Sequence, residues 1–471
     1  MEAKSSKFSL WILISVFFFW GFVAASNTIL IPIFKSNFDL TQWQSQLVDF
    51  AFYIAYFIGS LVYFLISLAG GDPLNKIGYK KGLILGLCIS AIGALGFVPA
   101  AGMGSFYLML FSLFTVALGF ALQQIVANPY VIALGNPETG AHRVSLAGGI
   151  NSFGTTIGPL VVAYAIFGNI EGSTQAEVGM NAVQTPYVAL FAAFLIFALI
   201  LGLSKLPAIK TEENLEKNIG ALKFPQIIWG MLAIFVYVGT EVTIQSNLPE
   251  LMKQENILGL GAENTVHFIS LYWGGLMIGR WVGAIKVFEL KSVFDKAMKF
   301  LVPFLAFAVI LAVNYVKGSP VNDLINFLPY ILILIAGFFL ANDKPALTMI
   351  LFGSIAAVMM LIGLFTEGKI ALYAFISGGL FCSVMWPCIF SLSIAGLGKY
   401  TNQGSSLLIM MILGGAILPP IQGFLADKIG IQPSYFIPFL GFAFLAFYGF
   451  KVKSILKNQG IDYDANVSAG H

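Results

Sequence analysis

Residues 119–130 read GFALQQIVANPY and place polar side chains inside an apolar stretch long enough to cross a bilayer. Gln123, Gln124 and Asn128 carry amides, and Pro129 lacks a backbone N–H. Unpaired polar groups are costly in lipid, so such residues face the interior of a helix bundle or a water-filled cavity. The segment therefore predicts a membrane helix that holds something polar.

The composition of the whole chain agrees with a membrane protein. Its 471 residues are 58% hydrophobic and only 10% charged, and the mean hydropathy is +0.87. Apolar stretches of about 20 residues suit spanning helices, whereas a membrane barrel would alternate with period two. The sequence therefore predicts an all-α integral membrane protein with the lipid bilayer as its surroundings.

Several classes of function lack support in the composition. The net charge of +3 comes without a basic cluster on a soluble domain, which argues against a nucleic-acid partner. The three cysteines lie in apolar spans and the three histidines are scattered, so neither a disulfide framework nor a metal site is expected. No nucleophile and base stand together, so we expect a protein that is not an enzyme and has no resident cofactor.

Hydropathy divides the chain into two hydrophobic halves joined by a polar linker. We expect an N-terminal bundle over 1–205, a cytoplasmic linker over 206–223 and a C-terminal bundle over 224–471. The first half has six predicted spans, at 9–34, 44–69, 82–100, 104–134, 145–168 and 185–205. The second has eight, at 224–248, 265–288, 295–316, 324–341, 346–366, 370–397, 404–426 and 433–453. Most loop lysines gather on one side, which predicts that both termini are cytoplasmic.

An internal repeat explains the unequal halves. Asn128 and Pro129 recur as Trp386 and Pro387, at an offset of 258, and residues 145–159 resemble residues 405–419. Earlier matches have an offset smaller by about 40 residues, which is the length of two added helices with their turns. The sequence thus predicts two six-helix repeats, with a helical hairpin inserted in the second half within about 295–366.

Two six-helix repeats around a central cavity resemble the major facilitator superfamily, whose halves rock about a site near the midplane. Residues 71–81, GDPLNKIGYKK, resemble that superfamily's loop motif G-x-x-x-D-R-x-G-R-R; the matching positions are Gly71, Asn75, Lys76, Gly78, Lys80 and Lys81. Glycines there permit a tight turn, and lysines suit the cytoplasmic side and helix C-termini. The alternative is an ordinary basic turn.

A closer resemblance extends over the whole chain. The stretches WGFVAASNTILIPIF (20–34), ALQQIVANPYVIALG (121–135), INSFGTTIGP (150–159), FVYVGTEVTI (235–244), SLYWGGLMIGR (270–280), SVMWPCIFSLSIAGLG (383–398) and QGSSLLIMMILGGAILPP (403–420) are similar to the fucose:proton symporter family, above all its glucose/galactose transporter branch. The resemblance implies a monosaccharide transporter of the cytoplasmic membrane, commonly coupled to a cation, that we expect to function as a monomer. Thr28 and Gln124 stand where that family carries carboxylates, and neither can titrate.

Cation coupling, if kept, needs other groups. Asp49 and Glu241 lie within predicted spans, where function is the default interpretation of an acid. For Asp49 the alternative is an acid near the membrane interface that is paired structurally. A sodium site would take an ionised carboxylate with oxygens from residues such as Asn27, Thr28 and Thr240, whereas a proton would need a buried acid. The loss of both family acids favours sodium slightly over a proton.

A sugar site needs amides for the hydroxyl groups and an aromatic face for the ring. The candidates are Asn27, Gln123, Gln124, Asn128, Asn151 and Gln245 as amides, and Trp273 and Trp386 as aromatic faces. For each amide the alternative is an interhelical hydrogen bond worth roughly 0.6–2 kcal/mol, and for each tryptophan it is packing. We expect a secondary active transporter that imports a monosaccharide of glucose, galactose or fucose type; the alternatives are an uncoupled sugar facilitator and an exporter of small amphipathic compounds.

Overall fold

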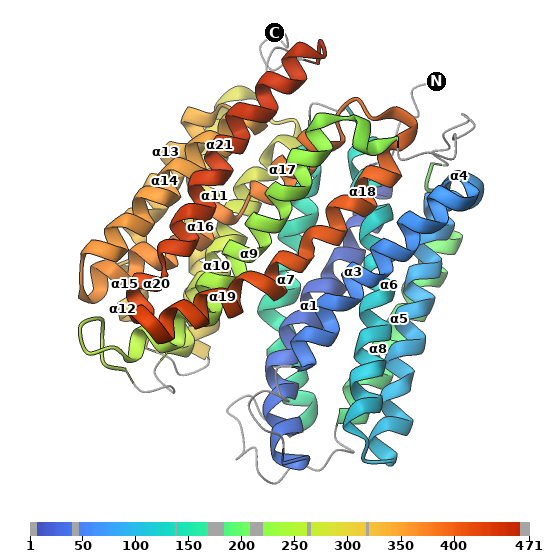
Figure 1. Cartoon of the computed structure of the whole chain (residues 1–471), viewed down its shortest axis with the longest axis horizontal. Coiled ribbons are helices and arrows are strands. Elements are labelled where there is room, and N and C mark those ends of the chain that lie inside the picture. The colour runs from blue at the N-terminus through green and yellow to red at the C-terminus, as the bar shows by residue number, and fades with distance from the viewer. Residues whose placement is uncertain are drawn as a thin grey trace. The chain divides into compact units, whose positions relative to one another are not determined.

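A computed structural model describes residues 7–39, 47–136, 139–167, 183–207, 220–260, 265–316 and 320–461. Within these ranges all regular structure is helical (Figure 1). Thirteen of the described stretches are long and apolar enough to span a membrane, and α7 (Gly140–Phe167), with 28 residues, lies between the fourth and fifth of them. The predicted all-α membrane fold with about fourteen spanning helices is confirmed.

The chain forms two compact units. Unit 1 comprises Met1–Gly135, Ile150–Lys223 and Gly398–Met410. Its helices are α1 (Lys7–Asn37), α3 (Leu47–Gly70), α4 (Pro73–Ile77), α5 (Tyr79–Gly102), α6 (Phe106–Ala133), α8 (Gln184–Leu203), η4 (Ala221–Lys223) and α18 (Thr401–Met410), with the part of α7 after residue 149. Helix α5 packs against both α6 and α8.

Unit 2 comprises Asn136–Gly149, Phe224–Leu397 and Met411–His471. Its helices are α9 (Pro225–Lys253), α10 (Val266–Gly283), η6 (Ile285–Phe288), α11 (Ser292–Val316), α12 (Asn322–Ile325), α13 (Leu328–Ala341), α14 (Pro345–Phe365), α15 (Gly368–Ile376), α16 (Gly378–Cys382), α17 (Met385–Ile394), α19 (Gly414–Ile429), α20 (Ile431–Ser434) and α21 (Phe436–Asn458). The linker predicted over 206–223 lies mostly outside the described residues. Each unit also takes in a short segment that the predicted division assigns to the other half.

Local signals in the sequence fix several helix ends. The Ser105 side chain caps α6 by accepting a hydrogen bond from the Leu108 N–H. Pro225 and Pro345 stand at the first positions of α9 and α14, where their missing N–H costs nothing. Asn342 ends α13 in a left-handed conformation with φ 48°.

Packing within unit 2 places the inserted hairpin. Helix α14 packs on α21, as α5 packs on α8 in unit 1, and α17 carries Pro387 where α6 carries Pro129. Helix α14 therefore takes the place of α5 in the predicted repeat. We infer that α11 and α13, which come between α10 and α14, are the two added helices.

Candidate functional site

Helix α6 is broken locally by Pro129, and α18 repairs the break. Pro129 has no N–H to donate to the carbonyl four residues earlier, that of Ile125. The Ser405 hydroxyl donates to this carbonyl over 2.9 Å. The Asn128 amide donates to the Gln124 carbonyl over 2.9 Å, while its buried Oδ1 has no hydrogen-bond partner among the described residues. Asn128 thus supports the bend and keeps one acceptor open.

The two adjacent glutamines of α6 have different surroundings. Gln123 is fully buried; its Oε1 accepts from Trp20 Nε1 at 3.1 Å, and its Nε2 donates to Ser90 Oγ at 3.1 Å. This amide joins α1, α5 and α6, which favours the interhelical alternative. Gln124 is partly exposed, and its Nε2 donates to the Tyr56 hydroxyl over 3.1 Å. Tyr56 therefore orients an amide that a ligand can reach.

Asn151 lies where α7 and α1 approach most closely in unit 1. Its Nδ2 donates to the Phe17 carbonyl over 3.0 Å, and its side chain is partly exposed. A Cβ added at Gly21 would lie 2.1 Å from the Asn151 carbonyl oxygen, so the two backbones touch. The contact fixes the direction of the amide.

The candidates on α1 and α3 are less central. The side chains of Asn27 and Thr28 on α1 lie outside the described residues. Asp49 is the third residue of α3, in its first turn. An acid there suits the positive end of the helix dipole and lies near the end of the span. This position favours the interface alternative for Asp49.

The loop motif forms two tight turns around α4. Gly71 and Gly78 have φ of 79° and 81°, which glycine adopts without strain. Lys76 Nζ donates to the Gly70 carbonyl over 3.1 Å, at the C-terminal end of α3. Lys80 Nζ donates to the Gly202 and Ser204 carbonyls over 2.7 and 2.8 Å, at the end of α8. Two of the motif's lysines therefore hold helix C-termini. Of the other motif positions, Asn75 has a buried Nδ2 with no partner among the described residues, and Lys81 is exposed.

Asp72, between the motif's glycines, was missed by the sequence analysis. Its buried carboxylate caps α4 by accepting from the Leu74 N–H at 2.9 Å, and it also accepts from the Tyr63 hydroxyl. An acid directly before a proline is a recognisable signal for a helix start, and it could have identified this residue.

In unit 2, the middle of α9 carries an acid beside unpaired oxygens. Glu241 Oε2 and the Tyr237 hydroxyl, one turn apart, are buried and have no hydrogen-bond partner among the described residues. The Tyr272 hydroxyl on α10 donates to the Glu241 carbonyl over 2.7 Å. Gln245, one turn further along α9, is partly exposed. Polar groups one turn apart share a helix face, so Tyr237, Glu241 and Gln245 form one polar row.

Aromatic rings adjoin this row. The rings of Trp386 and Tyr237 have centroids 6.2 Å apart, and Trp386 also stacks with Phe390 at 6.2 Å and 24°. Trp273 meets Tyr272 edge to face at 5.9 Å. Both tryptophans are partly exposed. Unit 2 therefore brings Glu241, Gln245 and Trp386 together, with Trp273 next to Tyr272.

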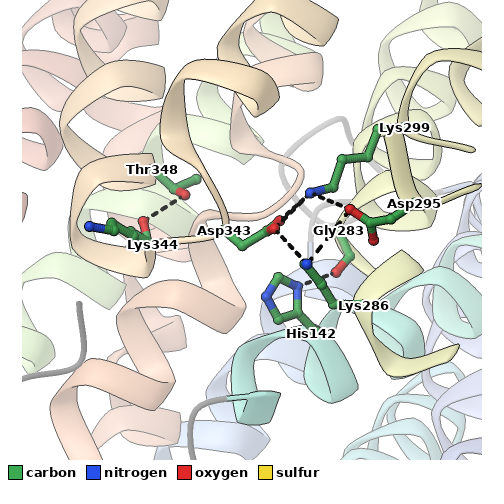
Figure 2. Close-up of polar contacts among 8 residues, drawn as sticks. All are labelled: His142, Gly283, Lys286, Asp295, Lys299, Asp343, Lys344 and Thr348. Carbon is green, nitrogen blue, oxygen red and sulfur yellow. Dashed lines mark hydrogen bonds and ion pairs between the residues drawn. The ribbon is translucent and has the colours of Figure 1, made fainter. Parts of the chain in front are cut away.

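A separate ionisable cluster lies in unit 2 where α11 begins and α14 is about to begin (Figure 2). Lys299 Nζ is 2.6 Å from an Asp343 oxygen and 3.1 Å from Asp295 Oδ2. Lys286 Nζ is 3.6 and 3.4 Å from the same two carboxylates. His142 Nδ1 makes a 2.7 Å hydrogen bond to the Gly283 carbonyl oxygen. Two lysines and two aspartates from η6, α11 and the turn before α14 balance in charge.

The electrostatics of this cluster favour ionised acids. Burial alone would raise the pKa of Asp343, but the Lys299 ammonium, with help from His142 and Lys286, holds the pKa below its usual value. A small cavity beside the cluster is lined by His142, Ser145, Asp343, Thr348 and Cys388, among others. No group of metal-binding side chains occurs in the described part of the chain. The cluster therefore fastens helices and has no ligand set for a metal.

Comparison with known proteins relates this geometry to a family. The family description "Major Facilitator Superfamily" matches residues 12–342. The glucose/galactose transporter of Brucella abortus is 35% identical over 451 residues, covering 95% of this chain and 94% of that protein. A putative glucose/galactose transporter of Helicobacter pylori is 33% identical over 464 residues (96% and 98%), and the L-fucose-proton symporter of Escherichia coli is 28% identical over 465 residues (94% and 92%).

Solved structures agree. The transporter FucP, crystallised in an outward conformation, superposes with a TM-score of 0.72 at 27% identity, over 94% of this chain and 98% of that chain. The human organic anion transporter MFSD10 has a TM-score of 0.58 at 14% identity and covers 94% and 97%. The second likeness shows the fold alone.

Proposed function

Because the chain belongs to the major facilitator superfamily, we propose that it is a secondary active transporter that imports a monosaccharide of glucose, galactose or fucose type by alternating access. The observation that carries the substrate class is the similarity, over nearly the whole chain, to proteins named glucose/galactose transporter and L-fucose-proton symporter. We place it in the cytoplasmic membrane with both termini cytoplasmic, and we propose that one chain suffices.

The polar side chains of each unit support a sugar substrate. Gln124 and Asn151 in unit 1 are partly exposed amides whose directions are fixed by hydrogen bonds to Tyr56 and Phe17. Such amides can donate to and accept from sugar hydroxyls without first being ordered, which lowers the entropic cost of binding. In unit 2, Gln245 offers an amide and Trp386 an aromatic face.

Counterflow into proteoliposomes with labelled glucose, galactose, fucose and mannose tests the substrate. We expect saturable exchange for at least one hexose, and an effect of Gln124→Leu on the half-saturating sugar concentration. Drug-resistance assays test the alternative of an exporter of amphipathic compounds. The absence of saturable flux for every hexose would remove the proposal.

We further propose that import is coupled to a cation at Glu241. This acid lies in the middle of α9 and has an unpaired oxygen, whereas Asp49 lies at the end of α3. Because Thr28 and Gln124 cannot titrate, sodium stays slightly favoured over a proton. Uptake in sodium-free buffer, and separately with the pH gradient collapsed, distinguishes the ions. Full uptake without either gradient would leave an uncoupled facilitator.

A further inference from the structure

Helices α10 and α16 approach each other through glycines. A Cβ added at Gly279 would lie 1.8 Å from the Ser383 hydroxyl oxygen, and one at Gly379 would lie 2.4 Å from the Tyr272 carbonyl oxygen. Larger residues at these positions would force the helices apart. This packing sets the residue after Gly279, which is Arg280, against the backbone at Ser383.

The backbone at Ser383 has an acceptor to offer. Pro387 cannot donate to the carbonyl four residues earlier, and α17 accordingly starts only at Met385. Arg280 Nε donates to this Ser383 carbonyl over 3.3 Å. In unit 1 the corresponding carbonyl is that of Ile125, which receives a neutral hydroxyl. The second repeat therefore fills the same kind of opening with a positive charge.

The charge of Arg280 reaches the acid of α9. Arg280 and Tyr237 are electrostatic neighbours of Glu241, and Tyr237 in turn is influenced by both Glu241 and Arg280. The ionisable groups that surround this acid are Tyr237 on α9, Tyr272 and Arg280 on α10, Cys382 on α16 and, beyond Tyr272, Tyr435. Among these groups Arg280 supplies the positive charge.

We propose that Arg280 is a positioning residue for cation coupling: held at the carbonyl that Pro387 frees, its guanidinium balances the Glu241 carboxylate when no coupling cation is bound. The proposal rests on the coupling role of Glu241. A proton or sodium ion that binds Glu241 neutralises its charge, so Arg280 opposes binding and promotes release. An opposite charge nearby changes proton affinity by about 10- to 1,000-fold, and the separation here, bridged by Tyr237, places the effect at the lower end.

Three variants in proteoliposomes test the proposal. Arg280→Gln removes the charge, Arg280→Lys keeps it, and Pro387→Ala returns a backbone N–H that competes for the Ser383 carbonyl. For each variant we would measure sugar counterflow, which needs no net cation release, and gradient-driven uptake over a series of sodium concentrations and pH values. Pro129→Ala is the matched control, because its freed carbonyl binds a neutral hydroxyl.

In Arg280→Gln we expect the coupling cation to bind about ten-fold more tightly. If the ion is sodium, its half-saturating concentration falls by that factor; if it is a proton, the pH midpoint rises by about one unit. Driven uptake slows because release is slow, whereas counterflow persists. Pro387→Ala shifts the dependence in the same direction by less, Arg280→Lys shifts it least, and Pro129→Ala leaves it unchanged.

An unchanged midpoint in Arg280→Gln, with counterflow and driven uptake lowered equally, would make Arg280 purely structural. If that variant does not fold, unchanged midpoints in both Arg280→Lys and Pro387→Ala refute the proposal, and a shift in Pro387→Ala supports it. Failure of the underlying function looks different. Wild-type uptake that ignores both gradients, or cation dependence that survives in Glu241→Gln, would remove coupling at Glu241 and the role of Arg280 with it.

Discussion

Replacing Lys299 by methionine is expected to destabilise unit 2 by about 3 kcal/mol, near the lower end of the 3–5 kcal/mol found when one partner of a buried ion pair is removed. The Lys299, Asp295 and Asp343 side chains are each only 8% exposed. Without the Lys299 ammonium, two buried carboxylates share Lys286, which is 35% exposed and stands 3.4 Å or more away. That remaining cation limits the loss.

Thermal unfolding in detergent measures the effect. At roughly 2–4 °C per kcal/mol for a unit of this size, the midpoint should fall by about 6–12 °C. Lys369→Met is the matched control, because Lys369 and Asp323 are as close, at 2.7 Å, but 52% and 38% exposed. An exposed pair contributes about 0–1 kcal/mol, so this variant should shift the midpoint by less than about 4 °C.

The double variant Lys299→Met/Asp343→Leu separates charge balance from packing. It removes both partners of the 2.6 Å pair and leaves Lys286 with Asp295. Because well-packed apolar residues replace a buried pair at little cost, most of the lost stability should return. The reasoning is refuted if Lys299→Met costs no more than Lys369→Met, or if the double variant is less stable than the single one.

Four further outcomes follow from the contacts described. Ser405→Ala leaves the buried Ile125 carbonyl without a donor and should cost about 1–3 kcal/mol in thermal unfolding; an unchanged midpoint would show that water replaces the hydroxyl. Gln123→Leu should lower the unfolding midpoint, because two buried partners lose their amide. Gln124→Leu should instead weaken sugar exchange at an almost unchanged midpoint, and equal effects of the two variants would contradict the difference in burial. Because the pKa of Asp343 is lowered from 3.8 in the folded protein, its stabilisation is present above about pH 4 and lost as pH falls through the folded pKa, so the midpoints of wild type and Asp343→Asn should converge in that acidic range.

The helices were predictable because a span is set by a local property. Each predicted range, from 9–34 to 433–453, overlaps a helix or a run of short helices, since about 20 apolar residues in succession must form hydrogen bonds within their own segment in lipid. The proline positions were equally visible. What fills the carbonyl that each proline frees was not, because Ser405 and Arg280 come from helices far away in the sequence.

Side-chain partners were the less predictable part of the candidate site. Periodicity separates Gln123 from Gln124 by about 100°, yet it does not tell which of the two faces Ser90 and Trp20. Lys286 and Lys299 looked like ordinary loop lysines on the side of the membrane richer in positive charge. Their pairing with Asp295 and Asp343 depends on how α11 packs, and no spacing in the sequence encodes that contact.

The ion-pair cluster of Figure 2 also makes the added hairpin a removable cassette. Lys286 precedes the hairpin and Asp343 follows it, and their charged atoms are 3.4 Å apart. The entry and exit points of α11 and α13 are thus neighbours, so a linker of a few residues could rejoin the chain once both helices are excised. Modules with adjacent ends can be gained or lost during evolution without rethreading the rest of the bundle. For protein engineering, this junction is the place to graft a reporter domain or to restore a twelve-helix transporter.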